Sequence, residues 1–300
     1  MNRSFAFIAA LLLTALSVSS ACFAADSLSP VHFTLEPRNG NGAEIQARFH
    51  TGTTDGGDHN WSDDFAAQEL AGLDVSALRS AGQHPLRFAI VREAGRLDCA
   101  GSGGSSHASG DCAFTPNNGF SNALASRGIV RPSSRQSFSM MALNVHLALA
   151  DAIRTARYPS PTIDQLIAMT ALNVSPGYIG DLAAAGYRPS KIDTLIEFKA
   201  LDISPEWIGG FARIGYATMP SDQLVQLKAL DITPAYVTGF ERLGYGRLPV
   251  SSLVQFKALG VTPAYVESLQ RAGLARLSPD KIVQMKALGI TPGEAAALPR

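Results

Sequence analysis

The pattern of hydrophobic and polar positions changes once along this chain, near residue 116. Before that point apolar and polar residues alternate, as at residues 31–35 and 43–49, which is typical of strands that bury one face. After it, apolar residues recur at the three-to-four spacing of amphipathic helices. The pattern therefore predicts an α+β fold. We expect a small antiparallel β module at residues 25–116, with about four to six strands, followed by helices.

Turn residues divide the β module further. Residues 85–92 and 96–99 are predicted strands joined by a turn at 93–95, and residues 65–79 are predicted to be short helical or turn structure. The glycine- and serine-rich stretch 101–110 is expected to be a flexible loop, because Gly and Ser favour turns. It lacks the Gly-Lys-Ser/Thr ending of a phosphate-binding loop, so we predict a hairpin connection.

Two cysteines flank that glycine-rich stretch. The N-terminal residues 1–24, which contain Cys22, are predicted below to be a cleaved export signal. Their removal leaves an even number of cysteines, Cys99 and Cys112. A disulfide between them would hold neighbouring strand ends together and contribute about 2–3 kcal/mol in the chain-entropy model. The alternative is a pair of free thiols. A metal site would need more ligands than two cysteines at this spacing provide.

Residue types that bind metals gather at residues 50–64. The candidates are His50, Asp58, His59 and Asp63. Their spacing matches neither the alternating ligands of an EF-hand loop nor a helical His pair with a Glu between them. Asp and Gly also build ordinary loops. We therefore expect a solvated loop here and predict no metal or cofactor.

The helical region repeats itself. A Ser/Thr-Pro phrase returns at a fixed interval of 29 residues without insertion. Its prolines are Pro176, Pro205, Pro234, Pro263 and Pro292. A fixed period of this size indicates stacked supersecondary units that bury a continuous core only together. We predict an α-solenoid of helix pairs over residues 142–300, preceded by a helical linker or capping region at 117–141.

Each repeat carries local signals for two short helices. Ser204 precedes Pro205, so a hydroxyl caps the first helix and proline occupies its first position, where no N–H is needed. Gly215 is predicted to end this helix in the left-handed backbone conformation. Tyr216 then supplies the apolar side chain that packs against the last helical turn in such a C-cap. The second helix is predicted to cover residues 224–230, with its apolar columns packed between units.

Both ends of the array deviate from the repeat. Residues 134–157 form one longer helical stretch in the pattern, because His146 stands where later units have Ser or Thr and no proline forces a break. We predict a capping unit whose two helices are fused. At the other end the last unit stops at Leu298, so one short helix is expected to close the array.

Two columns of basic residues recur with the repeat. The lysines are Lys199, Lys228, Lys257 and Lys286, and the arginines are Arg213, Arg242 and Arg271. Either column is a candidate surface for an acidic partner or an anionic polymer. The structural alternative is that each cation lies in the last turn of its helix, where it stabilises the helix dipole by about 0.3–1 kcal/mol.

The N-terminus resembles an export signal in its pattern. A basic residue precedes a short apolar run at residues 5–18, and small residues stand before a cleavage site after Ala24. Ser19 departs from the aliphatic residue expected three positions before a lipidated cysteine, so Cys22 is not predicted to carry a lipid. We expect residues 1–24 to be a signal peptide. The mature protein is then periplasmic or secreted, without a transmembrane helix.

The repeated phrase resembles a known repeat type. Ala-Leu-x-Ile/Val-Thr-Pro-x-Tyr-Val, followed by Leu/Phe-x-x-x-Gly-Tyr, is similar to tandem repeats of many bacterial proteins. Among these are C-terminal extensions of proteins similar to the β-lactam-sensor family of membrane metallopeptidases. The match covers residues 142–298, and residues 91–99 also look like a companion of such repeats. The chain lacks the His-Glu-x-x-His zinc motif, so the resemblance does not imply peptidase activity.

Composition and motifs argue against several classes of function, among them nucleic-acid binding by bulk charge and hydrolysis by a nucleophile-elbow serine. Basic and acidic residues are balanced, 25 of each, so no bulk attraction to nucleic acid or membranes is expected. The chain also lacks a Gly-x-Ser-x-Gly nucleophile elbow. We predict a non-catalytic exported protein that binds a protein partner through its solenoid, with envelope signalling implied by the resemblance. The alternative is a metal-binding or enzymatic β module with the solenoid as a targeting arm.

Overall fold

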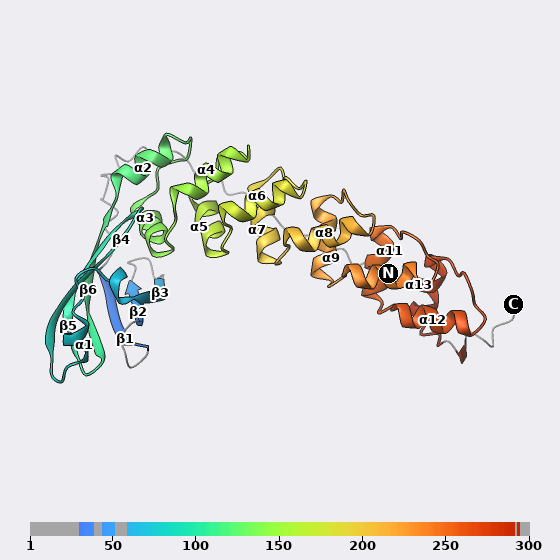
Figure 1. The fold of residues 1–300 in the computed structure, drawn as a ribbon, viewed down its shortest axis with the longest axis horizontal. Coiled ribbons are helices and arrows are strands. Elements are labelled where there is room, and N and C mark those ends of the chain that lie inside the picture. Colours follow the sequence, from blue (N-terminus) through green and yellow to red (C-terminus); the bar gives the residue numbers. More distant parts are fainter. Residues whose placement is uncertain (1–29, 39–43, 52–58, 292, 295–300) are drawn as a thin grey trace, which may run out of the picture.

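The structure is a computed structural model that describes residues 30–38, 44–51, 59–291 and 293–294. A six-stranded antiparallel sheet is followed by a run of helices, which confirms the predicted α+β fold. The sheet lies at one end of an elongated, curved arm of helices (Figure 1). The expected signal segment 1–24, the metal candidate Asp58 and the expected closing helix at Leu298 lie outside the described residues.

The sheet has the strand order β3-β2-β1-β6-β5-β4. The strands are β1 (Val31–Pro37), β2 (Glu44–Thr51), β3 (His59–Ala66), β4 (His84–Arg92), β5 (Gly95–Gly104) and β6 (His107–Pro116). Phe33 of β1 packs edge-on against Phe88 of β4, with ring centroids 5.0 Å apart, although two strands separate them in the sheet. The sheet therefore curls around its buried face, and its other face carries polar side chains.

The segment between the two edge strands closes this core. A short 3-10 helix (Ala67–Glu69) and α1 (Val75–Arg79) follow β3, as predicted for residues 65–79. Leu70 and Leu78 are fully buried there. Asp74 caps α1 by accepting the N–H groups of Ser76 and Ala77.

Two predicted loops of the β module contain strands. β5 and β6 continue through residues 101–110, and only Ser105 and Ser106 turn the chain, both with positive φ. Glycine is required within the paired strands because a Cβ at Gly101 would lie 2.1 Å from the carbonyl oxygen of Ser109. The predicted loop 50–64 likewise contains β3. Antiparallel pairing of β3 with β2 and of β5 with β6 outweighs the local turn preference of Gly, Ser, Asn and Asp.

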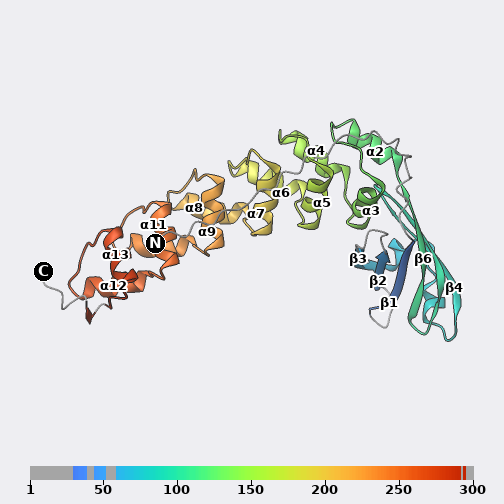
Figure 2. The same cartoon turned by 180° about the vertical axis from the view of Figure 1, so that it is seen from behind.

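The helices after the sheet form two layers. The first helices of the pairs are α2 (Asn118–Ala125), α4 (Leu147–Thr155), α6 (Pro176–Ala184), α8 (Pro205–Arg213), α10 (Pro234–Glu241) and α12 (Pro263–Arg271). The second helices are α3 (Ser134–Ala142), α5 (Ile163–Ala171), α7 (Ile192–Ala200), α9 (Ser221–Ala229), α11 (Val250–Ala258) and α13 (Pro279–Ala287). In both views α4, α6 and α8 lie along one side of the arm and α5, α7 and α9 along the other (Figure 1, Figure 2).

The local helix signals of the repeat are present. The Ser204 hydroxyl accepts the N–H of Trp207 at 3.1 Å, and Gly215 ends α8 with φ +88°. A second left-handed position follows each second helix. Its residues are Asn144, Asn173, Asp202, Asp231, Gly260 and Gly289. Asn, Asp and Gly are the types that adopt this conformation most readily.

The predicted fusion of two helices over residues 134–157 is wrong. Asn144 takes φ 57°, and the Val145 N–H donates to the Met140 carbonyl at 2.9 Å, so α3 ends before α4 begins. No proline is needed, because a left-handed residue with this bond is a sufficient helix end. The expected linker 117–141 also holds a helix pair: Gly128, with φ +76°, ends α2 as Gly186 ends α6.

Candidate functional site

The structure does not bring the predicted metal candidates together. His50 lies on the exposed face of β2, with its Nδ1 2.6 Å from Asn60 Oδ1. Asp63 points to the opposite face of β3, where its Oδ2 is 3.3 Å from Arg92 Nη2. His59 begins β3. Among the described residues, no group of three or more His, Cys, Asp or Glu side chains is arranged to hold a metal ion.

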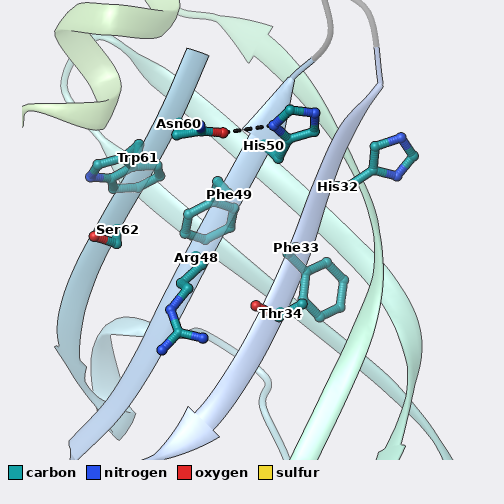
Figure 3. Close-up of a pocket in the computed structure, with 9 residues that line it drawn as sticks. All are labelled: His32, Phe33, Thr34, Arg48, Phe49, His50, Asn60, Trp61 and Ser62. Atoms are coloured by element: carbon teal, nitrogen blue, oxygen red, sulfur yellow. Dashed lines mark hydrogen bonds between the residues drawn. The ribbon is translucent and has the colours of Figure 1, made fainter. Parts of the chain in front are cut away.

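A groove of 380 Å³ crosses strands β1, β2 and β3 (Figure 3). Cross-strand pairing places its lining residues in three rows. The rows are His32, His50 and Asn60; Phe33, Phe49 and Trp61; and Thr34, Arg48 and Ser62. The described lining contains two imidazoles and a guanidinium but no carboxylate or thiol. It can accept hydrogen bonds or ligate through imidazole, and it presents no nucleophile hydrogen-bonded to a base.

The predicted disulfide is present. Cys99 of β5 and Cys112 of β6 are direct cross-strand partners, with Cα atoms 4.0 Å apart, and both are nearly fully buried. The free-thiol alternative is therefore wrong. The bond joins two adjacent strands near the middle of the sheet, so it stabilises the β module and carries no reactive thiol.

Arg92 joins the sheet to the array. It ends the edge strand β4, and its guanidinium lies over the rings of Trp61 and Phe65 on the other edge strand, 5.5 and 5.4 Å from their centroids. Its Nη1 donates to the carbonyl oxygens of Met141 (3.0 Å) and Ala142 (2.5 Å) at the end of α3. Only 11% of the side chain is exposed. Arg92 therefore fixes α3 to the curled sheet.

Glu93 supplies the helix cap that the first repeat lacks. His146 stands at the start of α4 and makes no side-chain cap of its own. Glu93, in the β4–β5 turn, accepts the Leu147 N–H at 2.9 Å with one carboxylate oxygen and lies 2.8 Å from His146 Nδ1 with the other. Burial raises the pKa of Glu93, but these two hydrogen bonds outweigh it and hold the pKa below its usual range.

Sequence reasoning missed both junction residues. Each acts across about 50 residues of chain, which no local pattern reveals. One signal was available: a repeat start with His146 in place of Ser or Thr leaves the amides of α4 without a local partner. The stretch 91–99, singled out as a companion of the repeats, contains Arg92 and Glu93 and forms the docking turn.

The lysine side chains make their contacts within the helical array. Each Nζ lies over an aromatic ring of the first helix in its own pair, at 4.4–5.4 Å from the centroid. The pairs are Lys199 on Tyr178, Lys228 on Trp207, Lys257 on Tyr236 and Lys286 on Tyr265. Lys228 and Lys257 also approach the carboxylates of Asp202 and Asp231 at 3.6 and 3.7 Å. These half-buried lysines hold the helices of the repeat together.

The tyrosines under this column bond the segment that joins each pair to the next. The Tyr236 hydroxyl donates to the Val261 carbonyl at 2.6 Å, and Tyr178 and Tyr265 make the same bond to Ile203 and Ile290. Burial raises the pKa of Tyr236 to about 12, so the hydroxyl remains a donor at neutral pH. The aromatic column is therefore structural.

The arginine column faces solvent. Arg213, Arg242 and Arg271 are all exposed at the ends of α8, α10 and α12. Arg271 pairs with Glu267 on its own helix at 2.9 Å. Within the described part of the chain, no ion pair or side-chain hydrogen bond is found for Arg213 or Arg242. These two guanidiniums are available to a partner.

A hollow of 350 Å³ lies on the same edge of the array, between the loops that follow α8 and α10. Tyr216 and Arg247 line it. The Arg247 guanidinium lies over the Tyr216 ring and donates to the Gly215 carbonyl at 2.6 Å. The edge of the array formed by the C-terminal ends of the first helices therefore carries basic side chains and a hollow.

No helix in the described ranges is long and apolar enough to cross a membrane. Comparison of the chain with protein-family models, with curated proteins and with solved structures finds no match.

Proposed function

We propose that this protein is a non-catalytic interaction protein whose helical array binds an acidic segment of a partner protein along the arginine column. The observation that carries this proposal is the contrast between the two basic columns. The lysines are stacked on aromatic rings, whereas Arg213 and Arg242 are exposed and have no partner among the described residues. Arginine is also the cation best suited to carboxylates, because its planar fork binds both oxygens.

The repeat sets the spacing that such a segment needs. Packed helices lie about 8–10 Å apart, so like helices in successive pairs repeat at about that distance along the arm. A peptide in the polyproline II conformation advances about 3.1 Å per residue and presents every third side chain on the same side. An acidic residue at about every third position would therefore meet one arginine per unit.

The disulfide supports an exported location. Buried disulfides between adjacent strands persist in oxidising compartments and are rare in the cytosol. Together with the N-terminal pattern, this supports the proposal that the mature protein is periplasmic or secreted. A role beside an envelope sensor rests on the repeat resemblance alone.

A charge-reversal variant tests the proposal. The triple change R213E/R242E/R271E should abolish binding of a synthetic peptide with Asp at every third position, measured by fluorescence anisotropy. The matched control R79E/R87E/R131E reverses three exposed arginines elsewhere, and it should bind as the unchanged protein does. Binding should also weaken with salt, since the Debye length is only about 10 Å at 0.1 M.

Two results would contradict this assignment. One is equal peptide affinity in both triple variants. The other is equal affinity for a peptide of the same composition whose Asp residues are clustered, because then only net charge is recognised. A catalytic β module is not proposed, because no nucleophile in the described groove is hydrogen-bonded to a base.

A further inference from the structure

A row of four polar side chains crosses the exposed face of the sheet. Asp111 of β6, His32 of β1, His50 of β2 and Asn60 of β3 are successive cross-strand partners. Directly opposite residues on one face have Cβ atoms about 4.5–5.5 Å apart. The two imidazoles are therefore immediate neighbours in the middle of this row.

Each imidazole is held by its Nδ1 atom. His32 Nδ1 pairs with Asp111 Oδ1. His50 Nδ1 lies 2.6 Å from Asn60 Oδ1, as Figure 3 shows. Carboxylate and amide oxygens only accept hydrogen bonds, so each Nδ1 carries the hydrogen. In the neutral rings, Nε2 then keeps its lone pair. Histidines that bind metals show this arrangement, with the second nitrogen donating to a carboxylate or carbonyl oxygen.

We propose that His32 and His50 form a binding site for one divalent late transition-metal ion, with Cu²⁺ bound most tightly. Imidazole suits copper, zinc and nickel, and the general order of affinities places Cu²⁺ highest. Bonds of about 2.0–2.1 Å from each Nε2 let one ion bridge neighbouring rings. The protein supplies two ligands, and Asp111 and Asn60 are positioning residues that orient the rings.

The groove provides the remaining coordination positions. Both histidines line it, and 62% of the His32 side chain is exposed, so water reaches the ion. A two-imidazole site with water ligands is consistent with the absence of three-ligand groups among the described residues. The site is independent of the arginine column, which lies on the helical array.

Another histidine of the same sheet provides a matched control. His107 is exposed on β6 and its Nδ1 lies 3.5 Å from Glu36 Oε1. Its cross-strand partner on β5 is Gly104, so no second imidazole stands opposite it there. His107 shares the exposure and the carboxylate partner of His32 but lacks the neighbour that would complete a site.

The test is a Cu²⁺ titration of the full-length protein by calorimetry, with electron paramagnetic resonance of the loaded sample. We expect one bound ion with two equatorial nitrogens. His32→Asn and His50→Asn should each weaken binding at least about tenfold and leave one nitrogen in the spectrum. Asp111→Ala should weaken binding about tenfold, because it frees the ring. His107→Asn should leave affinity and spectrum unchanged.

The proposal is overturned by unchanged affinity in the His32→Asn/His50→Asn double variant, or by a His107→Asn effect as large as that of His32→Asn. It is also overturned if the spectrum of the unchanged protein lacks two-nitrogen coupling, a result that does not depend on how any variant folds.

Discussion

Replacing Arg92 with methionine should weaken the junction between the β module and the array. Methionine keeps a similar length and packing but removes two hydrogen bonds to the α3 carbonyls, each about 1.5–3 kcal/mol from a charged donor. It also removes the cation–π contact with Trp61 and Phe65, about 1–2 kcal/mol when largely desolvated. Because methionine recovers part of the packing, we expect a loss of about 3–5 kcal/mol.

The two tryptophans of the chain make this measurable. Trp61 contacts Arg92, whereas Trp207 lies in α8, and its counterparts in α6, α10 and α12 are tyrosines. A Trp207→Tyr background therefore leaves Trp61 as the sole tryptophan, whose selectively excited fluorescence reports on the junction during urea unfolding. The reciprocal Trp61→Phe background, with Trp207 retained, should respond less to Arg92→Met, because stability in repeat arrays is largely local.

Arg96 provides the control for this experiment. Its ion pair with Asp98 is half-exposed, so Arg96→Met should change the free energy of unfolding by less than about 1 kcal/mol. Equal effects of Arg92→Met and Arg96→Met on the Trp61 transition would refute the junction role of Arg92.

Further changes test other contacts by thermal or urea unfolding. Glu93→Ala should destabilise the protein by about 0.5–2 kcal/mol at pH 7 through the lost cap. The pKa of Glu93 is lowered by folding, so its contribution is present above its unfolded value and lost as pH falls through the lowered one. The difference in free energy of unfolding between Glu93→Ala and the unchanged protein should therefore shrink as the pH falls. A difference that does not change with pH would contradict this. Tyr236→Phe should lose about 0.5–1.5 kcal/mol with its hydrogen bond to Val261, between α11 and α12; no loss would mean that the bond contributes nothing. Gly101→Ala should destabilise by about 1–3 kcal/mol through a backbone clash, whereas Gly177→Ala, with its nearest neighbour at 3.6 Å, should be close to neutral.

The repeat array was predictable because its determinants are local. The cap at Ser204, the proline after it and the left-handed Gly215 act within one or two turns of helix, so the 29-residue phrase encodes each unit by itself. The left-handed position after each second helix could also have been predicted from the sequence, because Asn, Asp or Gly recurs there in every pair. The disulfide was also within reach, because its cysteines flank one hairpin.

The β module shows where local reasoning stops. Residues 59–66 and 101–110 carry turn-forming residues, yet they form strands because cross-strand partners satisfy their backbone groups. Strand register then places His50 and Asp63 on opposite faces, which separates a cluster that looked continuous in sequence. The same register brings His32, 18 residues away, beside His50.

The sequence by itself thus determined the regular helix pairs, their period and the two basic columns, and it placed two cysteines where a disulfide could form. Only the tertiary structure decided which column is used internally, how Arg92 and Glu93 attach the array to the sheet, and which histidines are neighbours. The physical reason is the separation along the chain between the residues that interact. Caps, turns and periodic burial are set by residues a few positions apart, whereas sheet register and cross-domain hydrogen bonds depend on which distant segments meet when the chain closes on itself.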